Sequence, residues 1–225
     1  ALAMRERGVV RGDRVAAYLP NIPEAVIAFL ACASLGAIWT ICSPDMGPQA
    51  VLERLRQISP KVLIAADAVH YGGKAMDRSA AVTEIRAALP GIETLWVVET
   101  GFAQSKISDA HNLDEALSGD EAEVVAFEPE WLPFDHPLWI VYSSGTTGLP
   151  KAIVHGHGGV IVTACAGRLH YDLGASYDPD TFGERFHWYS ATGWVMWNQQ
   201  VGGLLFGTTI CLFDGAPNGE KGRAD

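Results

Sequence analysis

Apolar residues in this chain gather in short runs that alternate with longer segments of helical periodicity. The short runs are rich in β-branched and aromatic side chains, as is typical of buried strands. They cover residues 14–19, 37–42, 62–66, 95–98, 138–142 and 209–213. Helical patterns cover residues 24–35, 48–58 and 75–89, and a shorter one covers 113–117. This alternation predicts an α/β fold with a doubly wound, largely parallel sheet flanked by helices.

The charge-free stretch 25–44 is long enough to cross a membrane as one helix. Small and polar residues such as Ser34 and Gly36 interrupt it, and no Lys or Arg lies close to either end. Pro23 suits a first helical turn, and Gly36 suits a helix end. We therefore predict a helix followed by a buried strand, with no membrane span.

Composition narrows the class of protein further. With 225 residues, 48% of them hydrophobic, the chain can bury a sizeable core. A net charge of −10 argues against nucleic acid as the main partner, because such binding needs concentrated Lys and Arg. The four cysteines form no C-x-x-C pair, which favours buried thiols in a reducing, cytoplasmic setting over a metal or redox site.

The segment 142–151, Tyr-Ser-Ser-Gly-Thr-Thr-Gly-Leu-Pro-Lys, concentrates hydroxyls, glycines and one cation directly after an apolar run. Its glycines can let the backbone approach an anion closely, its hydroxyls can donate hydrogen bonds, and its Lys adds a positive charge. The spacing fits neither a Walker loop nor, in the nearby Gly156–Ile161 segment, a dinucleotide fingerprint. The candidate phosphate-binding residues are Ser143, Ser144, Gly145, Thr146, Thr147, Gly148 and Lys151.

These residues resemble the signature phosphate loop of the acyl-adenylate-forming, or AMP-binding, superfamily, which includes acyl-CoA synthetases, luciferases and peptide-synthetase adenylation domains. Residues 19–25, 36–39 and 42–47 extend the resemblance, which covers the chain to about Asp214. Together with 192–198, the segment 42–47 is more similar to the acetoacetyl-CoA synthetases than to the acetyl-CoA synthetases. Family members are longer, so the resemblance implies a partial N-terminal domain, with the lysine-bearing C-terminal domain absent.

The resemblance implies an acid–thiol ligase. ATP and a carboxylic acid would form an acyl adenylate with Mg²⁺ present, and coenzyme A would then accept the acyl group. Among the loop residues, Thr146, Thr147 and Lys151 are expected to be catalytic. Magnesium-binding and ribose-binding acidic residues would lie outside this chain. The alternatives are a ligase for acetate or propionate, or a non-catalytic nucleotide-binding remnant, and activity of this chain alone stays open.

The same resemblance places the acid-binding pocket at Trp194, Val195, Met196, Trp197 and Asn198. Trp194 would close the pocket so that only a short acid fits, and Asn198 could donate a hydrogen bond to a β-keto group. Core packing is the competing interpretation for Trp197 and Asn198. His155 and His157 lie two residues apart, but no carboxylate or thiol is close in sequence, so no metal site is predicted.

Two regions are expected along the chain. Residues 1–135 would form a first, N-terminally truncated α/β subdomain, and residues 136–225 would carry the phosphate loop, the acid-binding pocket and a disordered tail. Asp45 is expected to cap the helix that begins near Gly47. The oligomeric state has no signal in the sequence.

Overall fold

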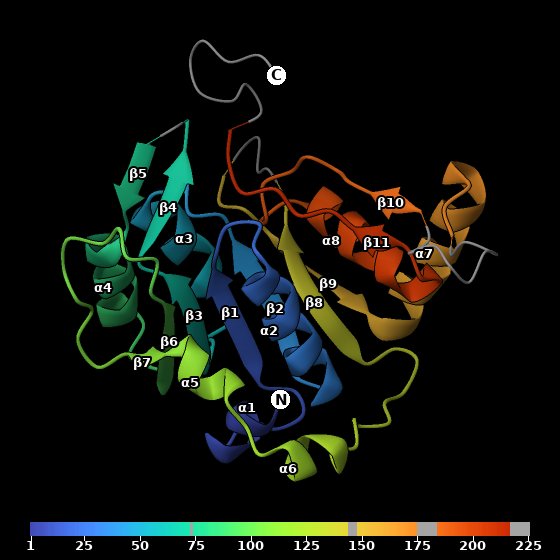
Figure 1. Ribbon diagram of the computed structural model, residues 1–225, viewed down its shortest axis with the longest axis horizontal. Helices are drawn as coiled ribbons and strands as arrows, with labels where there is room; N and C mark the ends of the chain where they lie inside the picture. Colours follow the sequence, from blue (N-terminus) through green and yellow to red (C-terminus); the bar gives the residue numbers. More distant parts are fainter. Residues whose placement is uncertain (73, 144–147, 175–183, 217–225) are drawn as a thin grey trace.

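A seven-stranded sheet forms the centre of the computed structural model, which describes residues 1–72, 74–143, 148–174 and 184–216 (Figure 1). The strand order is β7-β6-β3-β1-β2-β8-β9. The strands are β1 (Arg14–Tyr18), β2 (Ile38–Cys42), β3 (Val62–Ala66), β6 (Thr94–Val98), β7 (His111–Asn112), β8 (Pro137–Tyr142) and β9 (Ala152–Gly156). All neighbours are parallel except β8 and β9, so the predicted α/β fold with a largely parallel sheet is confirmed.

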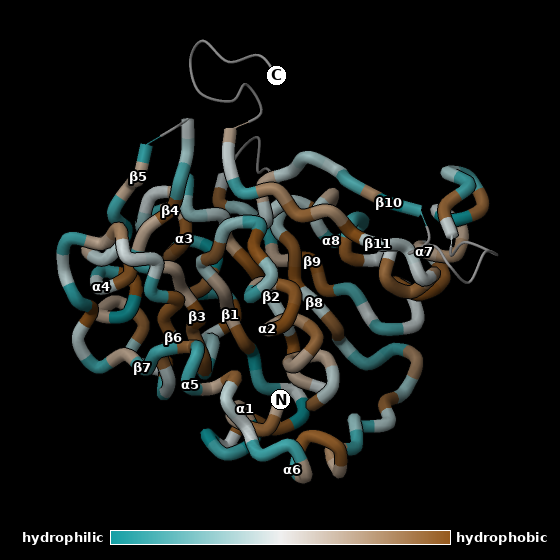
Figure 2. The backbone as a smooth tube through the Cα atoms, viewed as in Figure 1, coloured by the Kyte–Doolittle hydropathy of each residue, from teal (hydrophilic) through white to brown (hydrophobic). Residues whose placement is uncertain are grey.

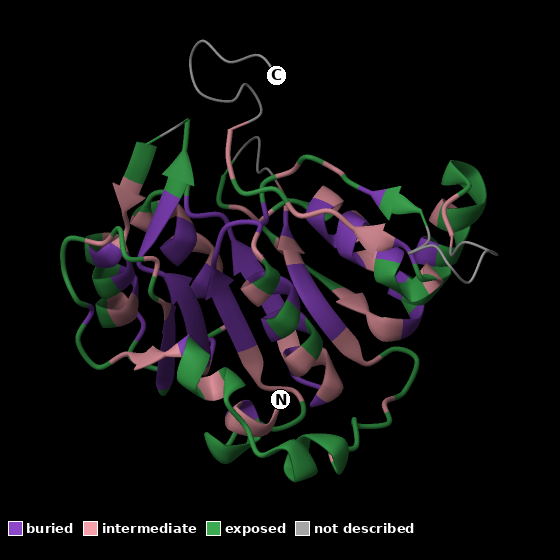
Figure 3. Cartoon of the chain, in the orientation of Figure 1, coloured by how far each residue is buried: buried purple, intermediate pink, exposed green. Residues whose placement is uncertain are grey.

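Helices cover both faces of the sheet. The helical elements are α1 (Leu2–Glu6), α2 (Pro23–Ser34), α3 (Pro48–Leu55), α4 (Ser79–Ala88), α5 (Leu113–Leu117), α6 (Glu121–Val125), α7 (His157–Tyr171), α8 (Val195–Gly202) and η1 (Gly203–Phe206). Side chains alternate along β1, so Val15 and Ala17 join a core with α1 and α2, while Ala16 and Tyr18 join a second core with α3 and α4. The apolar central strands are buried on both faces (Figures 2 and 3).

The helix predicted over 24–35 is confirmed as α2, with Pro23 in its first turn. Gly36 follows the helix with a φ of +64°, a left-handed conformation that favours glycine. The chain then enters β2, which confirms the predicted helix and buried strand. Across the described ranges, we find no helix that combines the length and the apolarity needed to cross a bilayer.

The helix predicted over 75–89 is only partly correct. Its first residues belong to β5 (Lys74–Asp77), which pairs antiparallel with β4 (Ala68–Tyr71), and the helix α4 begins at Ser79. Asp77 accepts a 2.7 Å hydrogen bond from the backbone N–H of Ser79, so it marks the helix start. The β4–β5 hairpin extends beyond the carboxyl ends of the central strands (Figure 1).

Three further predictions were wrong in detail. Gly47, not Asp45, is the N-cap of α3, and no side chain caps that helix. Pro48 occupies the first turn, where its missing N–H removes one of the donors that a cap would satisfy. The last predicted strand, 209–213, is shortened to β11 (Thr209–Ile210), which pairs with β10 (Arg185–Phe186). Cys165 is exposed, whereas Cys32 and Cys42 are buried as predicted.

The segment between β7 and β8 lies largely on the surface. All five residues of α6 are exposed (Figure 3), and Trp131 farther along is 94% exposed. Leu132 nevertheless packs toward Gly36, where an added Cβ would lie 2.8 Å from its side chain. The subdomain boundary near residue 135 stays a prediction. The tail predicted to be disordered, 217–225, lies outside the described residues.

Candidate active site

A cavity of about 260 Å³ opens at the carboxyl ends of β1, β2 and β3. Ligands of doubly wound sheets bind at this edge, where strand order reverses on either side of one strand. Here β1 is that strand, because the chain passes to β2 on one side and then to β3 on the other. The volume is below the roughly 300–1,000 Å³ of sites that enclose a drug-sized ligand, so it suits a small group or one part of a larger ligand.

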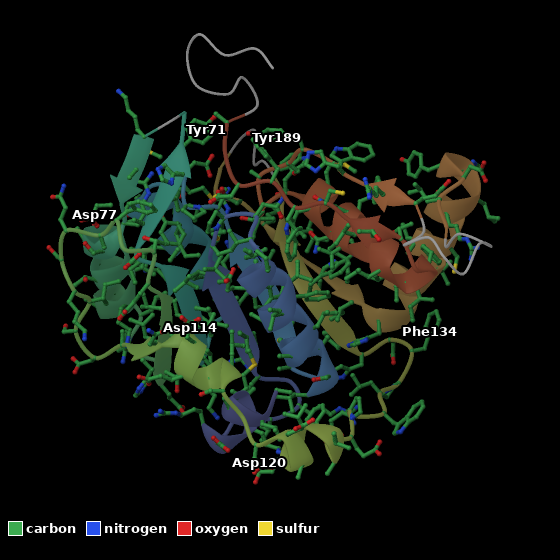
Figure 4. All side chains as sticks on the ribbon, viewed as in Figure 1. Tyr71, Asp77, Asp114, Asp120, Phe134 and Tyr189 are labelled. Carbon is green, nitrogen blue, oxygen red and sulfur yellow. The ribbon has the colours of Figure 1, made fainter. Side chains whose placement is uncertain are left out.

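Polar side chains converge on this cavity from distant parts of the chain. The polar lining residues with side-chain donors or acceptors are Asn21, Ser43, Asp45, His70, Tyr71, Tyr189, Ser190, Thr192 and Asp214. Tyr71 on β4 and Tyr189 lie near one another at this end of the molecule (Figure 4). Partial burial, together with Tyr71 and Asp45, raises the pKa of Tyr189, so its phenol remains a neutral hydrogen-bond donor.

A buried phenol holds the loop that follows β2. The hydroxyl of Tyr18 donates to the carbonyl oxygens of Pro44 at 3.1 Å and Met46 at 2.7 Å. Burial raises the pKa of Tyr18 to about 12, so it stays protonated at neutral pH. The last residue of β1 therefore fixes the wall of the cavity that Ser43 and Asp45 form.

The predicted phosphate loop, residues 143–151, begins at the same edge of the sheet, directly after β8. Ser144, Gly145, Thr146 and Thr147 lie outside the described residues. Ser143 and Lys151 close the neck of the loop with two hydrogen bonds of 3.0 Å, from Ser143 N–H to Lys151 O and from Lys151 N–H to the Ser143 hydroxyl. The neck therefore brings the chain ends of the loop together beside the antiparallel β8–β9 pair.

The two remaining predicted loop residues are accessible. Lys151 is exposed, so its ammonium can reach an anion at this edge. Gly148 is also exposed, with no atom within 4 Å of an added Cβ and no left-handed φ. The conformational freedom expected of glycine is therefore not used at Gly148.

The predicted acid-binding residues divide by burial. Trp194 and Val195, at the start of α8, are 51% and 44% exposed, and Met196 is half-buried. Trp197 is fully buried, and Asn198 is 4% exposed. The split therefore follows the order of the chain, with the residues at the beginning of α8 exposed and those that follow them buried. None of these five residues lines the 260 Å³ cavity, whose lining from this segment ends at Thr192.

Trp197 is held in place by a residue that the sequence did not single out. Its indole N–H donates to Asn21 Oδ1 at 2.9 Å, and its ring packs edge-on against Phe29, with centroids 6.3 Å apart. An indole N–H can only donate, so the amide oxygen of Asn21 must face Trp197. The amide nitrogen of Asn21 then remains for other acceptors beside the cavity that Asn21 lines.

The segment before α8 is hydrogen-bonded to the chain that follows β1. Thr192 is 2% exposed, and its hydroxyl donates to the carbonyl of Leu19 at 2.7 Å. A Cβ on Gly193 would lie 3.3 Å from the carbonyl oxygen of Ile41, so glycine lets this segment approach the end of β2 closely. Residues 192–198 therefore connect the ends of β1 and β2 to α8.

The two histidines considered as metal ligands lie around the start of α7. His155 packs against Trp139, with ring centroids 6.4 Å apart, and His157 lies 5.9 Å from His136. Burial, with the neighbouring His136, lowers the pKa of His157.

Sequence reasoning missed Asn21, Ser43, His70 and Asp214 as lining residues of the cavity. The available signal was their position, because each of the first three follows, or lies just beyond, a predicted strand. Parallel strands end at one edge, so polar residues after them gather there. The approach of Asp214 depends on the path of the chain after β11, for which no pattern exists in the sequence.

Comparison with known proteins shows which family and which relatives the chain resembles. The family model described as AMP-binding enzyme matches residues 1–224. The acetoacetyl-coenzyme A synthetase of Rhizobium meliloti is 40% identical over 218 residues, and the malonamoyl-CoA synthetase of Penicillium aethiopicum is 37% identical over 223. The alignments cover 96% and 95% of this chain, but 32% and 30% of those proteins.

A solved structure agrees with these sequence matches. The acetoacetyl-CoA synthetase from Streptomyces lividans superposes with a TM-score of 0.86 at 45% identity. It covers 96% of this chain, and this chain covers 32% of it. The chain thus spans about a third of the length of the curated relatives and of the solved structure that it matches.

Proposed function

The chain belongs to the AMP-binding enzyme family, and from that premise we propose that it is part of a ligase that joins acetoacetate to coenzyme A at the expense of ATP. The observation that carries this proposal is the 40–45% identity to acetoacetyl-CoA synthetases over 96% of the chain. The site geometry supports it, because the neck of the predicted phosphate loop and the cavity lie at the same edge of the sheet.

The proposed chemistry has two steps. An acetoacetate carboxylate oxygen attacks the α-phosphorus of ATP, the bond to the β-phosphate oxygen breaks, and pyrophosphate leaves. The thiol of coenzyme A then attacks the acyl carbon, loses its proton and expels AMP. Negative charge grows on the leaving pyrophosphate, and fixed N–H and O–H donors stabilise such charge without reorganising.

Within this scheme, the role of the phosphate loop is electrostatic. The neck formed by Ser143 and Lys151 holds the loop ends together, and the exposed ammonium of Lys151 is available to the phosphates. The hydroxyls of Ser144, Thr146 and Thr147, with the loop glycines, complete the proposed donor set. Positioning the reacting groups supplies the rest of the rate enhancement.

Magnesium commonly accompanies ATP and binds oxygen ligands. Among the described residues, no group of three or more Asp, Glu, His or Cys side chains is placed to hold a metal ion. These residues therefore offer no cage made of protein side chains alone for Mg²⁺, which usually binds through one or two carboxylates and the substrate phosphates. Free cysteines, with two of the four buried, suit the reducing cytoplasm that we propose as its location.

We propose that the segment around α8 determines which carboxylic acid is bound. Trp194 and Val195 are accessible and can form the wall of a short pocket, whereas Trp197 and Asn198 support it from the core. A relative named for malonamoyl-CoA is 37% identical, so another short acid with a carbonyl at the β carbon is the second candidate. Acetate and propionate lack that carbonyl and are the weaker alternatives.

Substrate profiling of the full-length gene product tests which carboxylic acid is the preferred substrate. Acetoacetate, malonamate, acetate, propionate and butyrate are compared by AMP release with ATP and coenzyme A present. We expect acetoacetate to have the highest kcat/KM. Acetate preferred over acetoacetate would contradict the proposed specificity, and ATP binding with no pyrophosphate exchange for any acid would favour a non-catalytic nucleotide-binding protein.

The variant Thr147→Ala tests the role of the loop. Loss of one donor to a developing charge typically lowers kcat by about 10²–10³-fold. We expect such a loss in acetoacetate-dependent pyrophosphate exchange. Thr163→Ala is the matched control, because Thr163 is exposed on α7 and its hydroxyl donates to Gly159 within the helix. Equal exchange rates in the two variants would remove Thr147 from the donor set.

A further inference from the structure

Gln57 reaches across to the exit of the phosphate loop from the turn that follows α3. Its side chain is exposed, yet its amide makes three hydrogen bonds. The amide nitrogen donates to Pro150 O at 2.7 Å and to Glu53 O at 2.8 Å. The amide oxygen accepts from the backbone N–H of Ala152 at 3.3 Å. One side chain thus bonds the residues on both sides of Lys151.

The chemistry of these partners fixes the orientation of the amide. A carbonyl oxygen such as that of Pro150 can only accept, and a backbone N–H such as that of Ala152 can only donate. Rotating the amide by 180° would oppose two oxygens at Pro150 and two donors at Ala152. Among common side chains of this length, the neutral amide is the one that offers a donor and an acceptor together.

The residue that precedes the predicted phosphate loop is also hydrogen-bonded to the end of α3. The hydroxyl of Tyr142, the last residue of β8, donates to the carbonyl of Arg54 at 3.1 Å. That carbonyl also accepts the backbone N–H of Gln57 at 3.2 Å. The guanidinium of Arg54 lies 5.8 Å from the centre of the Tyr142 ring. The end of α3 therefore contacts the chain where it enters the phosphate loop and where it leaves it.

We propose that Gln57 is a positioning residue for the predicted phosphate loop, holding its exit strand so that Lys151 stays aligned with the phosphates. This inference rests on the proposed function. Gln57 itself touches the backbone of residues 150 and 152, so it acts through the loop. The effect is electrostatic preorganisation, because donors that are already fixed need not reorganise as charge develops.

The test replaces Gln57 by a side chain of similar length without hydrogen-bonding groups, Gln57→Met, in the full-length protein. Gln49→Met is the matched control, because Gln49 is exposed on α3 and its amide donates to the Glu53 side chain instead. Hydrogen–deuterium exchange of a peptide covering residues 150–153 is measured alongside acetoacetate-dependent pyrophosphate exchange. The melting temperature should be unchanged, since exposed substitutions affect stability little.

Two changes are expected for Gln57→Met and none for Gln49→Met. Exchange of the Ala152 amide should become about fivefold faster, as for loss of one ordinary hydrogen bond. The kcat of pyrophosphate exchange should fall about tenfold, within the range for misplaced catalytic groups. The KM for acetoacetate should stay the same, because the acid pocket lies elsewhere.

Unchanged exchange of the Ala152 amide, or faster amide exchange with undiminished kcat, would overturn the proposed role of Gln57. A fall in kcat with an equal rise in the KM for acetoacetate would also overturn it, since that pattern indicates general disruption of the site. Failure of the proposed function looks different. The wild-type protein would then show no acetoacetate-dependent pyrophosphate exchange, while amide exchange would still show whether Gln57 holds the loop.

Discussion

The two halves of the central sheet differ in how completely they are covered. On one side, every residue of β3 is at most 1% exposed, with α3 and α4 packed against it. On the other side, Ile153 and Val154 of β9 are 44% and 56% exposed, and Leu169 of α7 is 83% exposed. Core burial is therefore concentrated around β1, β3 and β6, whereas Ser143 and Lys151, the neck of the predicted phosphate loop, lie at the end of the less covered β8–β9 pair.

One substitution in each half of the sheet should change the free energy of unfolding by very different amounts. Ile64→Ala on β3 should lower the free energy of unfolding by about 2–5 kcal/mol, because it leaves a cavity in a packed core. Ile153→Ala on β9 should change it by about 0.5 kcal/mol or less, as for other exposed sites. Urea unfolding of both variants checks this. Equal losses would mean that β9 is as well covered as β3.

The second prediction concerns the connection between the halves, the hydrogen bond from Trp197 to Asn21. Asn21→Leu should cost about 1–3 kcal/mol, because the buried indole N–H loses its acceptor. The same measurement on Trp197→Phe and on the double variant completes a thermodynamic cycle. We expect a coupling energy of about 0.5–3 kcal/mol between the two sites. Simple additivity of the two single variants would show that this bond does not couple them.

The smallest expected effect is the pH dependence contributed by His157, on the less covered side. Its folded-state pKa is lowered by burial, so the unfolded chain binds a proton more readily. Stability is therefore complete above the ordinary pKa of about 6.5 and is lost as pH falls through the lowered value. The stability difference between the wild type and His157→Gln should change as the pH falls below about 6.5. A difference independent of pH would contradict this.

The elements most accurately predicted are those whose environment is uniform. The run 62–66 became β3 with the same bounds, because a strand buried on both faces must be apolar at every position. The sequence pattern predicts a helix for residues 75–77, yet they pair with β4 across Gly72, which has a φ of +59°. Their pattern fits a helix and a strand equally well, and the hairpin partner decided between them.

In the candidate site too, features that depend on neighbouring residues were predictable, whereas features that depend on distant residues were not. The order of glycines, hydroxyls and Lys151 within ten residues was enough to predict a phosphate loop, because those groups are contiguous in the chain. The placement of Trp197 was not predictable, since its hydrogen-bond partner Asn21 lies 176 residues away. Gln57 is likewise 93 residues from Pro150, and its amide has no function that local sequence could indicate.

The sequence alone determined which chemistry is possible and which segments become buried strands and helices, because composition and periodicity act over a few neighbouring residues. Which loops meet at the carboxyl edge of the sheet, and which distant side chains hold them, depends on the tertiary structure. Strand order brought the ends of β1, β2, β3 and β8 together. The physical reason is that contacts between residues far apart in the chain depend on how whole elements pack, and no local pattern encodes that packing.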